Sequence, residues 1–277
     1  MKRVLGHCLA GLAVVAGGVG VMSACAHNDS SLFIQDVIYL IPVAAGQVCS
    51  YTADPNQLFQ SSGTLDVAFR DQYFAEFLVA NQLVAQSNSA QLMTETSTVN
   101  IEGAIVRVTD AAGNQLDSFT SLAAGTVYPS TGTVPGYAAI GATIASRASI
   151  KAVVGAKGAG LGLGGSTTIV TYSKFFGHTL GGTYVESNEF EYPIEVCEGC
   201  LVTFSESLSN CNGVMLKGPN CLGAQASGST LSTLPIPCTV GQDTAIDCSQ
   251  CQGTAACQGV YATAPVPGGC LDAGGGG

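Results

Sequence analysis

The stretch EFEYPIEV, Glu189–Val196, decides the fold class of this 277-residue chain. A large apolar side chain stands at every second position from Phe190 to Val196, with glutamate or proline between. Side chains of a β-strand alternate between two faces, so this segment predicts a strand with one buried face and the glutamates in water. Because Pro193 has no N–H to donate to a neighbouring strand, we expect this strand to lie at a sheet edge.

Earlier segments show the same period of two residues. Leu65, Val67 and Phe69 alternate with Asp66, Ala68 and Arg70, which predicts a half-buried strand. The alternation in 99–108 changes parity at Gly103, where we expect a β-bulge, and a turn follows over 109–115. DQYFAEFLVANQLVAQ (71–86) fits both helical spacing and strand alternation, and the strands on either side favour a strand.

The segments that follow also favour strands. GYAAIGATIASRASIKAVV (136–154) is strand-like but rich in small residues, and TTIVTYSKFF (167–176) is rich in β-branched and aromatic residues. Short strands without interleaved helices predict an all-β fold, an antiparallel β-sandwich that is immunoglobulin-like in general architecture. The chain contains no tryptophan, so the Cys…Trp…Cys spacing of true immunoglobulin domains is absent.

The character of the sequence changes after Phe204, where alternation fades and cysteine, glycine, serine and proline increase. We therefore place a β-sandwich domain at 32–204 and a cysteine-rich segment at 205–277, which ends in a glycine tail that we expect to be disordered. The C-terminal segment lacks the apolar content for a core of its own, so cross-links must order it.

The first 24 residues have the features of a signal peptide. Lys2 and Arg3 precede an apolar run, Leu9–Met22, that is interrupted by glycines. A membrane-spanning helix needs roughly 20 apolar residues, so this run is too short to span and matches the core of a secretory signal.

The end of this run, Met22-Ser23-Ala24-Cys25, resembles the lipobox of bacterial lipoproteins. The resemblance implies cleavage before Cys25 and a diacylglycerol on its thiol, with 25–31 as a lipidated tether. Ala26 after the cysteine implies delivery to the outer membrane. Ala24-Cys25-Ala26 also satisfies the A-x-A rule of ordinary signal cleavage, which would release a soluble periplasmic or secreted protein. In leader and composition the chain resembles cysteine-rich bacterial envelope lipoproteins.

The acidic net charge of the chain restricts the kinds of partner that it can bind. After the leader the chain has seven basic and 19 acidic side chains, and no basic patch. We therefore expect no nucleic-acid binding, and we expect the N-terminal lipid, rather than attraction to anionic lipids, to anchor the chain to the membrane. A protein or glycan partner would bind to loops, of which SLAAGTVYPSTGTVPGY (Ser121–Tyr137) is the longest candidate.

Ten cysteines remain besides Cys8 in the leader and Cys25, and an even number in an exported chain predicts disulfides. Nine of them lie between Cys197 and Cys270, so at least one of these must pair with a cysteine outside that range if all are bonded. Cys49 is the only cysteine available for that bond, and the other pairings stay open. The disulfide candidates are Cys49, Cys197, Cys200, Cys211, Cys221, Cys238, Cys248, Cys251, Cys257 and Cys270.

Two C-x-x-C pairs, Cys197/Cys200 and Cys248/Cys251, allow two other hypotheses. Four thiolates could bind zinc, but an oxidising compartment disfavours free thiolates. A thioredoxin-type redox pair needs a helix after the first cysteine, and the sequence here favours a strand. The glycines at 160, 162 and 165 match a dinucleotide fingerprint but precede a strand-like segment, so we interpret them as a loop between strands. We expect no cofactor and no metal.

The sequence offers little for catalysis. Beyond the leader only His27 and His178 remain, and we expect His178 to lie in a turn at the surface. The serine- and zinc-hydrolase motifs G-x-S-x-G and H-E-x-x-H are absent. We therefore expect a structural or binding protein of the cell envelope without a catalytic role. The alternatives are an exported hydrolase whose carboxylates meet only in the fold, and a periplasmic zinc-binding protein.

Overall fold

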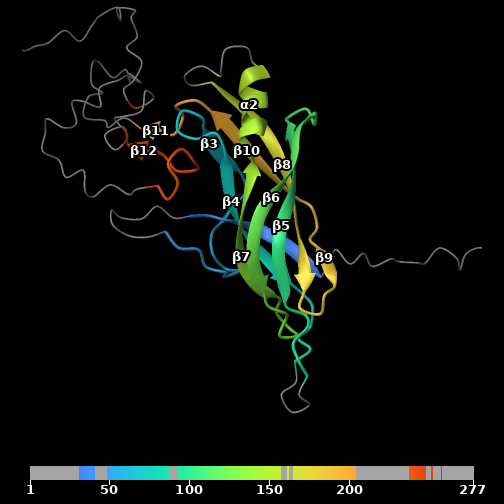
Figure 1. Ribbon diagram of the computed structural model, residues 1–277. Coiled ribbons are helices and arrows are strands. Elements are labelled where there is room, and N and C mark those ends of the chain that lie inside the picture. Colours follow the sequence, from blue (N-terminus) through green and yellow to red (C-terminus); the bar gives the residue numbers. More distant parts are fainter. Residues whose placement is uncertain are drawn as a thin grey trace, which may run out of the picture.

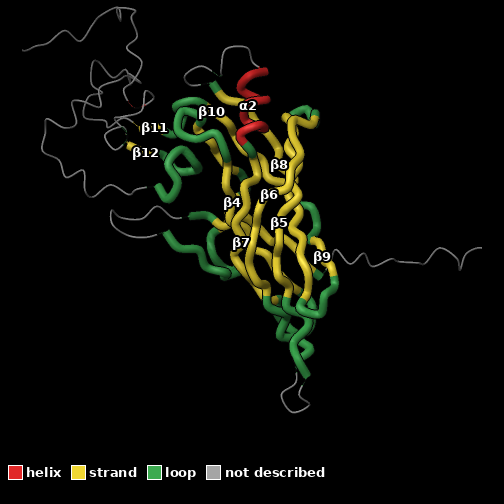
Figure 2. The backbone as a smooth tube through the Cα atoms, viewed as in Figure 1, coloured by secondary structure: helices red, strands yellow, loops and turns green. Residues whose placement is uncertain are grey.

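In the described part of the chain, two large β-sheets pack face to face, and helix α2 (Arg147–Ala156) lies at an end of the sandwich (Figures 1 and 2). A computed structural model describes residues 31–40, 49–87, 93–156, 161, 165–203, 237–247, 251 and 257. The prediction of an all-β sandwich is confirmed. Within these ranges, no helix has both the length and the apolar content to cross a membrane.

The first sheet has four strands and the second has six. The first has the order β2-β1-β4-β7, with β1 Leu32–Ile38, β2 Phe59–Gln60, β4 Tyr73–Asn81 and β7 Gly136–Ala145. The second has the order β3-β10-β8-β5-β6 with β9 beside β8, formed by β3 Gly63–Asp66, β5 Val99–Asp110, β6 Gln115–Val127, β8 Ser166–Thr179, β9 Tyr184–Glu186 and β10 Phe190–Cys197. A small parallel pair joins β11 Val202–Thr203 to β12 Ile246–Asp247.

The core lies between the sheets and is built by the alternating apolar positions of their strands. Phe77 on β4 and Phe175 on β8 are both fully buried, and their rings meet edge to face at 5.3 Å between centroids. Burial of each such ring contributes roughly 1.5–3 kcal/mol. The segment 71–86 that fitted two patterns therefore forms a strand over Tyr73–Asn81, as predicted.

The predicted bulge at Gly103 is confirmed. The pairing of β5 with both neighbouring strands shifts register between Ile101 and Gly103. A Cβ atom at Gly103 would lie 2.6 Å from the Phe176 ring on β8. Only glycine lets this aromatic ring lie across the bulge.

Part of the segment predicted as strand over 136–154 is a helix. β7 ends at Ala145, and α2 runs over Arg147–Ala156. The Ser146 hydroxyl oxygen accepts the Ser149 N–H at 3.0 Å, which is the hydrogen bond of a helix N-cap. Ile150 and Val153 of this helix are buried against the core. The burial of Ile150 and Val153, three residues apart, follows the period of a helix and not that of the predicted strand.

Three further expectations were wrong. β10 is an interior strand, because β3 pairs with its residues 194–197, in parallel rather than antiparallel orientation. Pro193 lies just before this paired stretch, so its missing N–H interrupts no bond to β3. The predicted long loop Ser121–Tyr137 is mostly strand, and the true connection is 128–135. The glycine-rich segment joins α2 to strand β8, rather than two strands.

Candidate functional site

The segment 237–247 packs against one end of the sandwich, and we call this contact the junction. Polar side chains are buried there, among them Gln242. Gln242 binds the backbone of Phe74 on β4: its Oε1 accepts the Phe74 N–H at 3.2 Å and its Nε2 donates to the Phe74 carbonyl at 2.6 Å. The backbone of the segment also binds β3, through Asp66 N–H to the Gly241 carbonyl and Asp243 N–H to the Thr64 carbonyl, both at 2.9 Å.

Asp243 is the centre of the junction. Its carboxylate accepts the Tyr73 hydroxyl at 2.8 Å and the Thr64 N–H at 2.8 Å, and the Tyr73 hydroxyl lies 3.2 Å from that of Tyr192. Burial raises the pKa of Asp243 above its ordinary value and raises the pKa of Tyr73 far above 10. Asp243 has a φ of 60°, a left-handed conformation that asparagine and aspartate adopt more readily than other side chains.

A small pocket lies beside this cluster. Its lining includes Tyr51, Tyr73, Glu76, Cys238 and Asp243, and its free volume of about 30 Å³ admits one or two water molecules. Glu76 is on β4, where its partial burial raises the pKa of its carboxyl to about 7. Burial and the nearby Glu76 carboxylate also raise the pKa of Tyr51. Two carboxyl groups, those of Glu76 and Asp243, therefore line one small pocket.

The raised pKa of Glu76 predicts a pH-dependent stability. Between pH 4.5, its ordinary pKa, and about 7, the folded chain holds a proton on Glu76 that the unfolded chain releases, so stability falls as pH rises. Glu76→Gln removes this loss. We expect it to raise the free energy of unfolding by about 1 kcal/mol at pH 8, discounted for partial exposure, and to change it little at pH 4.5.

Urea unfolding of the wild type and of Glu76→Gln at both pH values measures this difference. Glu191→Gln is the control, because Glu191 is an exposed carboxylate on β10. An equal effect of Glu76→Gln at the two pH values would show that Glu76 ionises normally.

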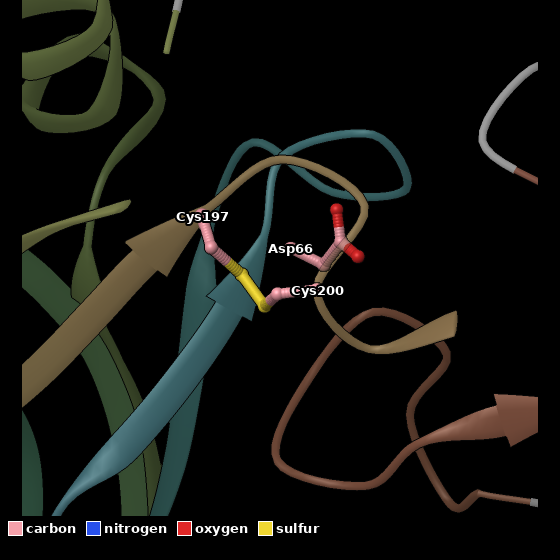
Figure 3. Close-up of side chains that lie close together, drawn as sticks. All are labelled: Asp66, Cys197 and Cys200. Carbon is pink, nitrogen blue, oxygen red and sulfur yellow. A yellow bond between two sulfur atoms is a disulfide. The ribbon is translucent and has the colours of Figure 1, made fainter. Parts of the chain in front are cut away.

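The C-x-x-C loop after β10 is held by a buried carboxylate. Cys197 and Cys200 form a disulfide, and Asp66 lies beside it (Figure 3). The fully buried Asp66 accepts the N–H groups of Gly199 at 2.8 Å and of Leu201 at 3.0 Å. Gly199 has a φ of 76°, where a side chain would be strained.

This geometry bears on the zinc and redox hypotheses. A carboxylate oxygen of Asp66 and the sulfurs of Cys197 and Cys200 lie within 4.8 Å of one another, close enough to share a metal ion. The two sulfurs are bonded to each other, however, and zinc needs them as thiolates. The loop leads into strand β11 and not into a helix, so no helix N-terminus lowers the pKa of a thiol here.

Two other disulfides are present in the described residues. Cys49 is bonded to Cys238, 189 residues away, and Cys251 is bonded to Cys257. The first bond attaches the junction segment to the start of the sandwich, beside the pocket. The second packs with Val202 and Phe69 in a small cluster of its own. Cys25 and the remaining disulfide candidates, Cys211, Cys221, Cys248 and Cys270, lie outside the described residues, as does the boundary predicted near 205.

His178 lies elsewhere, on strand β8 and not in the predicted turn. Its Nδ1 is 2.8 Å from Oε1 of Glu102, and both side chains are about half exposed on the outer face of the six-stranded sheet. The two carboxyl groups that line the pocket, those of Glu76 and Asp243, were not singled out by the sequence. A glutamate inside an apolar strand and an aspartate after Gly241 were the only signals.

Comparisons with known proteins leave the family open. No family model matches the sequence, and no curated protein matches it. Among solved structures, the solution structure of a candidate late embryogenesis abundant (LEA) protein is similar over 71% of this chain and 87% of that chain. The two share 9% sequence identity with a TM-score of 0.32, which is too low to establish a common fold.

Proposed function

We propose that the chain is a lipid-anchored protein of the cell envelope that serves as a structural or binding module and catalyses no reaction. The observation that supports this best is the Cys49–Cys238 disulfide, which joins the connection between β1 and β2 to the segment 237–247. Disulfides of this kind persist in oxidising compartments, to which the predicted signal peptide would send the chain. The lipobox-like sequence at Cys25 supports an anchor, and Ala26 supports the outer membrane.

The junction supports a structural role more than a catalytic one. Its polar side chains bind one another: Asp243 is bonded to Tyr73, and Gln242 to the backbone of β4. Polar groups that satisfy each other beside a small pocket stabilise the fold.

A protein or glycan partner would need a surface that the fold leaves open, and the outer face of the six-stranded sheet is one. On this face Arg107 lies 3.9 Å above the Tyr172 ring and is paired with Glu189 at 2.9 Å. Leu122 on the neighbouring strand β6 is 93% exposed. Aromatic, charged and apolar groups side by side are typical of protein contact surfaces.

The anchor is tested by the intact mass of the protein purified from membranes of a bacterial host. We expect the mature chain to begin at Cys25 and to carry a diacylglycerol on its thiol. In Cys25→Ser the thiol is absent, so lipid attachment should be lost and the protein should leave the membrane fraction. A mature wild-type chain that begins at His27 without lipid would refute the anchor and favour the soluble alternative.

A further inference from the structure

Three connections between strands meet at the end of the sandwich opposite α2 (Figures 1 and 2). They are 82–98, 128–135 and 180–183, and we call their described residues the tip. The strand ends beside them are paired: Val99 with both Val127 and Thr179, and Asn81 with Gly136. The Ser130 N–H donates to the Leu83 carbonyl at 2.7 Å, and the Leu180 N–H donates to the Thr98 carbonyl at 2.8 Å. The three connections are therefore bonded to one another or to the adjoining sheet.

The tip carries large apolar side chains in water and almost no charge. Each of its three connections exposes at least one: Val84 58%, Met93 48%, Tyr128 67%, Val134 51% and Leu180 56%. Glu95 is the single charged residue among the described positions of the tip. Its carboxylate accepts the N–H groups of Gln86, Ser87 and Ser97, so it is directed into its own loop. Exposed apolar groups gathered at one end of a molecule mark an interaction site.

The chain enters the fold at this same end. Leu32, the first residue of β1, pairs with Asn81, and the Gln82 N–H donates to the Ser31 carbonyl at 2.7 Å. Only five residues lie between Cys25 and Ser31, so an extended connection of six steps spans at most about 20 Å. Strand β8 alone has 14 residues, which is about 45 Å at 3.3 Å per residue. A lipid on Cys25 therefore keeps the tip near the bilayer, whereas the β5–β6 turn at the opposite end is free to lie far from it.

We propose that the tip inserts its apolar side chains into the interfacial region of the bilayer that holds the Cys25 lipid. This inference rests on the lipid anchor proposed above. Interfacial binding is stabilised by apolar burial at the boundary of headgroups and acyl chains, and tyrosine is enriched there. Because the chain is acidic, anionic lipids do not attract it electrostatically. The almost uncharged tip is therefore the part of the molecule best suited to contact the bilayer. The tip then orients the sandwich with α2 and the C-x-x-C loop toward the aqueous side.

The absence of tryptophan allows a direct test, since a single introduced indole reports its own surroundings. Tyr128→Trp places the indole at the tip of the mature lipidated protein, reconstituted in phosphatidylethanolamine–phosphatidylglycerol vesicles that contain brominated phosphatidylcholine. We expect the indole to emit at a shorter wavelength than an indole in water does. We also expect the bromine atoms to quench this emission strongly. Ala111→Trp in the β5–β6 turn and Leu122→Trp on the outer sheet face are the matched controls, and both should emit as in water without quenching.

A pair of further substitutions distinguishes the contribution of the tip from that of the lipid anchor. Val134→Asp with Leu180→Asp, in the Tyr128→Trp background, should abolish the quenching while the lipid still floats the protein with the vesicles. Quenching that survives these charges, or an unquenched Tyr128→Trp indole in the parent protein, would overturn the proposal. If intact mass shows no lipid on Cys25, the same variants are mixed with preformed vesicles. Quenching there supports the tip without the anchor, and its absence overturns both.

Discussion

Replacing Cys49 and Cys238 together by serine should lower the free energy of unfolding by about 5 kcal/mol. The bond closes a loop of 189 residues, and on the chain-entropy account a bond restricts the unfolded chain more as its loop grows. The folded state also loses the covalent attachment of the junction segment, which brings Asp243 into the sandwich. Urea unfolding without reductant, monitored by circular dichroism, measures the change.

The matched control is the disulfide between Cys251 and Cys257, which are only six residues apart. The double replacement Cys251→Ser with Cys257→Ser should cost about 2 kcal/mol by the same loop-entropy reasoning. Equal losses for the two pairs would mean that loop length is not the cause. A Cys49/Cys238 variant as stable as the wild type would show that the hydrogen bonds of Gln242 and Asp243 hold the junction without a covalent bond.

Asp66→Ala should cost about 3 kcal/mol, because it leaves buried N–H groups without an acceptor. The Asp66 carboxylate is inaccessible to solvent and accepts the N–H groups of Ala68, Gly199 and Leu201. These bonds fix the loop that carries Cys200, so the loss should begin there. Hydrogen exchange of the Gly199 and Leu201 amides should accelerate more than exchange in β5 or β8.

Asp66→Asn is the conservative control. Its amide oxygen can still accept the N–H groups that reach Oδ1 of Asp66, while its NH₂ group faces the Leu201 N–H, which needs an acceptor. We expect an intermediate loss of stability and faster exchange at Leu201 than at Gly199. A loss below about 1 kcal/mol for Asp66→Ala would mean that water replaces the carboxylate.

The strands could be predicted where one face is apolar and the other polar. β10 alternates from Phe190 to Val196, and in β5 a one-residue change of parity located the bulge at Gly103. The helix α2 was missed because the strand-like pattern of 136–145 was extended over it, although Ser146 just before the helix was an available N-cap signal. The parallel pairing of β3 with β10 depends on contacts across 130 residues, which no local pattern encodes.

The candidate site was harder to predict, because its polar residues look like surface residues in the sequence. Asp66 stands in an alternating stretch where its position predicted exposure, and in the structure β3 ends at this residue and the side chain is buried. That assignment was wrong because strand alternation stops where the chain turns. Asp243 meets Tyr73 across 170 residues, so only tertiary structure brings the two together.

The junction also constrains the order in which the molecule can be completed. A chain that emerges amino-terminus first exposes β1, β4 and β10 long before Gln242 and Asp243 are available to cover their end. Contacts between residues so distant in sequence are the slowest to form, and the uncovered strands are prone to misassociate in the meantime. Nascent chains halted before residue 237 should therefore stay bound to a chaperone. The complete chain should no longer need one.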